Sequence, residues 1–169
     1  GYLVKKVVFN IELLPFVRAL SFAVIHVFFL LLLIVILLGY GYLPKATYLQ
    51  VTYYLLCMVC LCIALGRIFA TLNVLFRDAS NFVALILQFG IWTLPILWQP
   101  MQLSETILRI LMLNPAFYVI AGYRDSFLDG VWFTEHVGHT VYFWLTTIAL
   151  DIAGRKLLLR LKGQFPDLM

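Results

Sequence analysis

Long apolar runs separated by short polar stretches dominate the pattern of this chain. The first run covers residues 16–38, in which Arg18, close to its start, is the single charged residue. About 20 apolar residues in a helix cross the hydrocarbon core of a bilayer, and this run supplies them. The pattern therefore predicts a membrane-spanning helix and a lipid environment for the chain.

The same pattern predicts an all-α integral membrane protein with four transmembrane helices. We expect these spans at about 16–38, 48–65, 82–98 and 137–153, and the second may extend as helix toward Phe76. Pro95 lies inside the third run and is predicted to kink that helix near its outer end. Together these runs make residues 16–154 a transmembrane domain.

A fifth apolar stretch, 107–128, contains both charged residues and an Asn114-Pro115 break. Asparagine is a good N-cap and proline a good first helical residue, so one short helix should end near Leu113 and another begin at Pro115. Neither is long enough to span alone. We expect a helical hairpin that re-enters the membrane or lies at its outer interface.

The distribution of basic residues indicates the orientation of this hairpin and of the spans. Nine of the twelve Lys and Arg residues fall in alternate connections, which the positive-inside rule assigns to the cytoplasm. If 107–128 crossed completely, the basic end of the chain would lie outside. Both ends of the chain are therefore predicted to be cytoplasmic, and the hairpin to lie on the outer side.

Two segments outside the transmembrane domain are predicted to be cytoplasmic. Residues 1–15 alternate apolar side chains with Lys5, Lys6 and Glu12, as in an amphipathic segment at a membrane surface, and Pro15 ends it. This segment is either a simple anchor or a docking element for a cytoplasmic partner. Residues 155–169 form a basic tail.

Composition agrees with a membrane protein and excludes several functions. Hydrophobic residues make up 64% of the chain and charged residues 12%, against about 25% charged in soluble domains. There is no phosphate-binding Gly-x-x-x-x-Gly-Lys-Ser/Thr motif and no recognisable catalytic set. No basic patch of the kind that binds nucleic acid is present. We expect a chain that is not itself an enzyme and holds no cofactor or metal.

Isolated polar residues in apolar surroundings each allow a functional and a plain interpretation. His136 and His139, beside Glu135, have the spacing of a metal pair, but interfacial histidines are usually only solvated. Asp151 lies inside the last span, where carboxylates are often functional, yet Arg155 is four residues on and can pair with it. His26 is expected to be neutral and packed.

Aromatic residues are 16% of the chain. Most of them lie near the predicted outer interface, which is typical of the aromatic belt of membrane proteins. Others, such as Tyr53, Tyr54, Trp92 and Trp144, fall nearer the interior of the spans. Flat aromatic faces there would suit the guidance of a sugar chain.

The motifs of the chain occur in the order found in one family. Arg77-Asp78-Ala79-Ser80-Asn81-Phe82, Leu94-Pro95-Ile96-Leu97-Trp98, Leu113-Asn114-Pro115 and Gly122-Tyr123-Arg124 resemble those of ABC-2-type permeases that export polysaccharides and wall teichoic acids. The opening segment, from Lys5 to Pro15, looks like the cytoplasmic coupling segment of that family. The aromatic triplet Tyr142-Phe143-Trp144 favours a resemblance to the teichoic-acid exporters of that family over the O-antigen and capsule exporters.

This resemblance implies a permease subunit of an ATP-driven exporter in a bacterial inner membrane. A full subunit of the family has six spans, so this chain would supply four of them. Two copies would form a homodimer with two cytoplasmic ATPase subunits, and ATP and Mg²⁺ would bind to those subunits. A lipid-linked polysaccharide or teichoic acid would pass outward between the copies.

The resemblance also implies two sets of functional residues. The ATPase-coupling residues would be Phe9, Glu12, Leu13 and Pro15. The pore or outer gate would be formed by Pro95, Trp98, Asn114, Pro115, Tyr118, Tyr123 and Arg124. A second function, a membrane scaffold or assembly protein without transport, explains the spans and the aromatic belt equally well. It does not explain a proline-broken hairpin.

Overall fold

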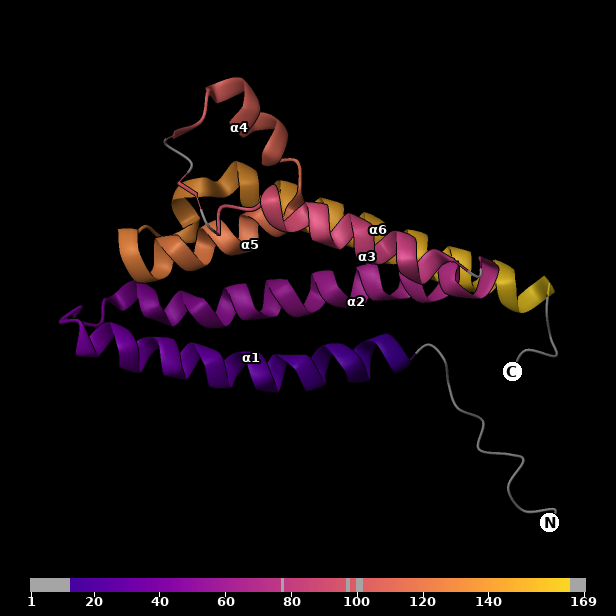
Figure 1. Ribbon diagram of the computed structural model, residues 1–169, viewed down its shortest axis with the longest axis horizontal. Helices are drawn as coiled ribbons and strands as arrows, with labels where there is room; N and C mark the ends of the chain where they lie inside the picture. The colour runs from indigo at the N-terminus through magenta and orange to yellow at the C-terminus, as the bar shows by residue number, and fades with distance from the viewer. Residues whose placement is uncertain (1–12, 77, 97, 100–101, 165–169) are drawn as a thin grey trace, which may run out of the picture.

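The computed structural model describes residues 13–76, 78–96, 98–99 and 102–164. Every regular element within this part of the chain is helical, and the longer helices lie roughly along the long axis of the molecule (Figure 1). The first of them, α1 (Leu14–Gly39), has Pro15 in its first turn, where the missing N–H removes no helical hydrogen bond. Only Ala19 and Ala23 are buried in α1, so its large apolar side chains remain exposed.

The central element is α2 (Val51–Leu75), which follows the short 3₁₀ helix η2 (Ala46–Gln50). It contacts α1, α3, α5 and the last helix, α6 (Val137–Gln164). Buried residues recur in α2 at Tyr54, Cys57, Leu61 and Ala64, which lie on one face of the helix. That face packs against Phe143 of α6, and the two helices form the core of the described structure.

The helix in the third apolar run is shorter than predicted. α3 (Ala79–Trp92) ends three residues before Pro95, and a turn follows from Thr93. The predicted kink at Pro95 is therefore wrong, because the helix ends instead of bending. The physical reason is that proline offers no N–H and its ring collides with the carbonyl four residues earlier, while the residue before it avoids helical geometry.

The predicted helix break at Asn114 and Pro115 is confirmed. α4 (Glu105–Leu111) is bent by 109° from the helical segment Pro115–Asp129, which begins with α5 (Pro115–Arg124). A π-helical turn, η4 (Asp125–Asp129), continues α5, and a 3₁₀ helix, η5 (Phe133–His136), leads into α6. In Figure 1, α5 lies beside α2 whereas α4 projects away from the bundle. We call α4, α5 and η4 the hairpin.

The prediction of four spans is only partly supported. Among the described residues, α1 and the helix from Ala46 to Leu75 are long and apolar enough to cross a membrane, and the bent pair of the hairpin would make a third if it were one span. The 14 residues of α3 are fewer than a full crossing needs. The last helix has 28 residues, but His139, several threonines and Asp151 lower its apolar character.

Candidate functional site

The start of α5 is fixed by Asn114. Its side-chain Oδ1 accepts a hydrogen bond from the backbone N–H of Ala116 at 3.0 Å, which is the geometry of an N-cap. Its Nδ2 donates to Oγ1 of Thr93 at 3.4 Å. Asn114 therefore both begins α5 and links the hairpin to the turn that follows α3.

Arg124, at the other end of α5, makes a second link to the same turn. Its guanidinium donates to the backbone carbonyls of Pro95 and Trp98, each at 3.2 Å. The Trp98 ring also lies 6.3 Å from the ring of Phe117 in α5, centroid to centroid. Three of the predicted gate residues, Pro95, Trp98 and Arg124, are thus in direct contact although they are far apart in the sequence.

The two predicted gate tyrosines point into the helix bundle. The Tyr118 hydroxyl shares hydrogen bonds with Thr140 at 2.8 Å and Tyr53 at 3.2 Å, and its ring stacks on Phe143. The Tyr123 hydroxyl lies 3.1 Å from Nε2 of His26. These contacts hold α5 against α1, α2 and α6. Both tyrosines therefore bind the hairpin to the helix bundle.

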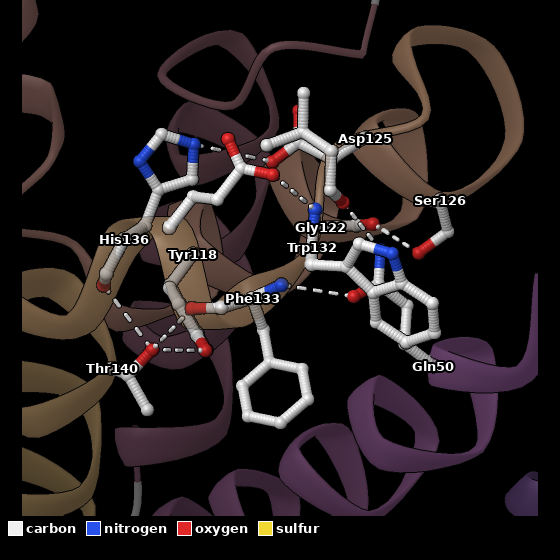
Figure 2. Close-up of polar contacts among 11 residues, drawn as sticks. Gln50, Tyr118, Gly122, Asp125, Ser126, Trp132, Phe133, His136 and Thr140 are labelled. Atoms are coloured by element: carbon white, nitrogen blue, oxygen red, sulfur yellow. Dashed lines mark hydrogen bonds and ion pairs between the residues drawn. The ribbon is translucent and has the colours of Figure 1, made fainter. Parts of the chain in front are cut away.

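Polar side chains of η2, and of Lys45 just before it, bind the segment that follows α5. Lys45 Nζ donates to the carbonyl of Leu128 at 2.7 Å, and Thr47 Oγ1 donates to that of Ser126 at 2.8 Å. Gln50 makes two bonds: its Nε2 donates to the carbonyl of Val131 at 2.6 Å, and its Oε1 accepts from Phe133 N–H at 2.9 Å (Figure 2). These three residues, Lys45, Thr47 and Gln50, which we call the η2 seat, bind backbone groups of η4 and of the segment that follows it.

Asp125 and His136 form the charged part of the site. Figure 2 shows the His136 ring turned toward the Asp125 carboxylate, and Nε2 and Oδ2 are 3.9 Å apart. The Asp125 side chain is 22% exposed. Burial raises the pKa of this carboxyl above its usual value, while the neighbouring His136 opposes that rise.

A second polar cluster lies at the opposite end of α2 and α6. Arg67 pairs with Asp151, and Asp151 also accepts from Arg155 Nε at 2.9 Å. The predicted pairing of Asp151 with Arg155 is therefore confirmed, and Arg67 adds a second cation across the helix interface. Close to this cluster, a β-carbon on Gly66 would be 3.2 Å from the Pro15 side chain, so α1 approaches α2 closely there.

The predicted ATPase-coupling residues are only partly described. Phe9 and Glu12 lie outside the described residues, as do most of segment 1–15 and residues 165–169. Leu13 is exposed immediately before α1, and Pro15 packs against Gly66. Both therefore lie at the end of α1 that faces the Arg67–Asp151–Arg155 cluster.

The contacts of this site join helices to one another. Among the described residues, no three His, Cys, Asp or Glu side chains gather as metal ligands. The His136 and His139 rings are stacked with centroids 6.0 Å apart, and His136 faces Asp125. The site contains a bent helical hairpin that is joined by hydrogen bonds to α1, α2, α6, η2 and the turn after α3.

Sequence reasoning did not single out the η2 seat or Asp125. Thr47 and Gln50 are three residues apart just before an apolar run, and both are buried. Polar residues at that spacing lie on the same side of a helical turn. If that side is buried, they need hydrogen-bond partners, because polar groups are seldom buried without them. The partner segment, however, is about 80 residues away in sequence and has no pattern that identifies it.

The chain is similar in sequence to known permease proteins. No family model matches the chain. Two curated O-antigen export system permease proteins, both named RfbA and both from Klebsiella pneumoniae, are 26% identical to it over 168 residues. The matches cover 99% of this chain and 64% of each relative, so the chain spans somewhat less than two thirds of their length. The chain is similar to polysaccharide export permeases over nearly all of its own length.

Proposed function

We propose that this chain is part of a permease subunit that exports a polysaccharide across a bacterial inner membrane. The observation that carries the proposal is its continuous similarity to O-antigen export permeases, with the match covering 99% of the chain. The two long apolar helices and the bent hairpin support it, because non-helical backbone at membrane depth is tolerated only where it is buried in protein or lines a water-filled cavity.

The hairpin is the outer gate in this proposal. Asn114 and Arg124 fasten the two ends of α5 to the turn after α3, while Tyr118 and Tyr123 bind α5 to the helix bundle. Pro95, Trp98 and Pro115 shape that junction by ending one helix and beginning another. A shift of α3 or of the bundle is then transmitted to α5 through hydrogen bonds.

The energy source we propose is ATP hydrolysis by a separate cytoplasmic subunit. Phe9, Glu12, Leu13 and Pro15 would form its docking contact, and Pro15 packs on Gly66 of α2. A push on the start of α1 would therefore reach α2 directly. Two permease copies would enclose the path, with both ends of this chain in the cytoplasm, and ATP and Mg²⁺ would bind the ATPase alone.

The cargo we propose is a lipid-linked polysaccharide of the O-antigen kind. Both relatives carry an O-antigen export name, and neither supports a wall teichoic acid. The aromatic triplet that inclined the sequence resemblance to teichoic acid has packing roles: Phe143 is fully buried and Trp144 donates to the Tyr53 hydroxyl at 3.0 Å. These contacts carry no preference for a cargo.

Co-purification of the full-length protein with the ATP-binding subunit encoded in the same cell tests the proposed coupling. We expect a stoichiometric complex in mild detergent that is weakened by Glu12→Arg and retained by Glu105→Gln, which alters an exposed carboxylate on the opposite side. A full-length permease that purifies without any ATPase under these conditions would contradict the proposal and favour a membrane scaffold.

A further inference from the structure

A cavity of about 180 Å³ lies between α5, α6 and the first turn of α2. Most of its wall is aromatic or apolar, and Asp125, His136 and His139 add polar groups to it. The residues that the argument below uses are Tyr118, Ala121, Asp125, His136, His139 and Tyr142. Its size is below that of the pockets that hold drug-sized ligands, so it suits one small ring and not a chain.

The Asp125 carboxylate is the principal hydrogen-bond acceptor in this cavity. Among the described residues, the nearest imidazole nitrogen is Nε2 of His136, at 3.9 Å, and no side chain or backbone N–H donates to the carboxylate within hydrogen-bond distance. A carboxylate has about four acceptor positions. It can therefore receive two hydroxyl groups of a ligand at once.

The charges around the cavity select against an anionic ligand. Asp129 and Glu135 act on Asp125 as further negative charges, whereas Arg124 and His136 oppose them. Arg124 is already committed to the carbonyls of Pro95 and Trp98. A neutral ligand rich in hydroxyl groups fits this balance better than a phosphate does.

The aromatic rings of the wall are held in fixed positions. The Tyr142 hydroxyl donates to the carbonyl of Leu113 at 2.8 Å, and the Tyr118 hydroxyl pairs with Thr140. Their rings are therefore presented as rigid faces. The C–H groups on one side of a sugar ring pack well on such faces, because the face of an aromatic ring carries partial negative charge.

We propose that this cavity binds a single neutral sugar residue, with Asp125 accepting two of its hydroxyl groups and Tyr142 and His139 packing on its ring. The proposal rests on the proposed function and adds a sugar-recognition site to it. The cavity is lined by residues of α5, in the hairpin, and of α6, so a bound sugar would contact both helices. Binding of a sugar residue of the polysaccharide in the cavity would therefore change the contacts between α5 and α6.

The test uses the full-length protein in lipid nanodiscs and a panel of methyl glycosides of glucose, galactose and mannose. Saturation-transfer NMR or calorimetry detects weak binding in the millimolar range. We expect saturable binding of at least one glycoside. Asp125→Asn should weaken it by about tenfold or more, because one acceptor oxygen becomes a donor and the negative charge that strengthens both hydrogen bonds is lost.

Two further variants make the result decisive. Ala121→Leu fills the cavity while leaving the Asp125 carboxylate in the protein, and it should also abolish binding. Glu105→Gln removes a carboxylate of the same hairpin that is 87% exposed and pairs with Arg109, so it should bind as the unmodified protein does. Size-exclusion profiles confirm that each variant is folded.

The outcomes separate the cavity from the proposed function. No saturable binding, or binding that survives both Asp125→Asn and Ala121→Leu, would overturn the sugar site. If surface polysaccharide still depended on the protein in that case, polysaccharide export would stand without it. If surface polysaccharide did not depend on the protein at all, the proposed function would fail, and the sugar site would fail with it as a recognition site for cargo.

Discussion

Gly122 of α5 lies so close to the ring of Tyr54 of α2 that no β-carbon fits between them. Tyr54 is 1% exposed and belongs to the buried cluster that joins α2 to α6. The hairpin is therefore packed directly onto the core of the bundle. Any movement of α5 changes the packing of α2, which is the coupling that a gate requires.

Gly122→Ala should push α5 away from α2. We expect the free energy of unfolding to fall by about 1–3 kcal/mol, the usual effect of overpacking a buried contact. Thermal unfolding of the purified full-length protein measures it. Gly90→Ala in α3 is the matched control, because nothing lies within 4 Å of the added carbon. Equal unfolding temperatures for the two variants would contradict the contact.

Arg124→Ala should release the hairpin from the turn after α3. Two hydrogen bonds from a charged donor are lost, and we expect a loss of about 1.5–3 kcal/mol together with reduced surface polysaccharide. Arg109→Ala is the control, since Arg109 is 79% exposed and pairs only with Glu105 in the described structure. If both variants exported equally well, Arg124 would not connect the gate to α3.

Asp151→Asn should destabilise the protein more than Arg155→Gln does. Arg67 is 16% exposed, so it is left as a poorly solvated charge when its partner is neutralised, whereas Arg155 is 63% exposed. We expect about 2–3 kcal/mol for Asp151→Asn and less than about 1 kcal/mol for Arg155→Gln. Chemical denaturation of the full-length protein in detergent would show the difference. Equal losses would place the stabilising contact with Arg155 instead.

Gln50→Leu should loosen the segment between η4 and α6. It leaves the Val131 carbonyl and the Phe133 N–H without their side-chain partner, at a cost of about 1–3 kcal/mol. Amide hydrogen exchange around 130–136 should accelerate. The exposed Gln102, replaced by Leu, is the comparison and should leave that exchange unchanged. Unaltered exchange in Gln50→Leu would mean that the η2 seat does not hold this segment.

The elements that could be predicted from the sequence are those set by local chemistry. The apolar run 16–38 predicts α1, and Asn114-Pro115 predicts the break at which α5 begins, because a cap and a proline act within one helical turn. Pairing of Asp151 with Arg155 follows from a spacing of four residues. Each of these depends on neighbours in sequence.

The features that escaped prediction depend on long-range contacts. The contact of Arg124 with Pro95 and Trp98, and that of the η2 seat with residues 126–133, join segments whose spacing has no periodic pattern. The apolar run that continues through Pro95 predicts a bent helix there. The helix ends at Trp92 instead, and the freed carbonyls of the following turn become the acceptors for Arg124.

The most direct test of the central claim is the amount of polysaccharide on the cell surface when the gene for the full-length protein is deleted and then restored. We predict that surface polysaccharide disappears on deletion, accumulates inside the cell, and returns with the unmodified gene but only weakly with Arg124→Ala. Unchanged surface polysaccharide in the deletion strain would contradict an export function.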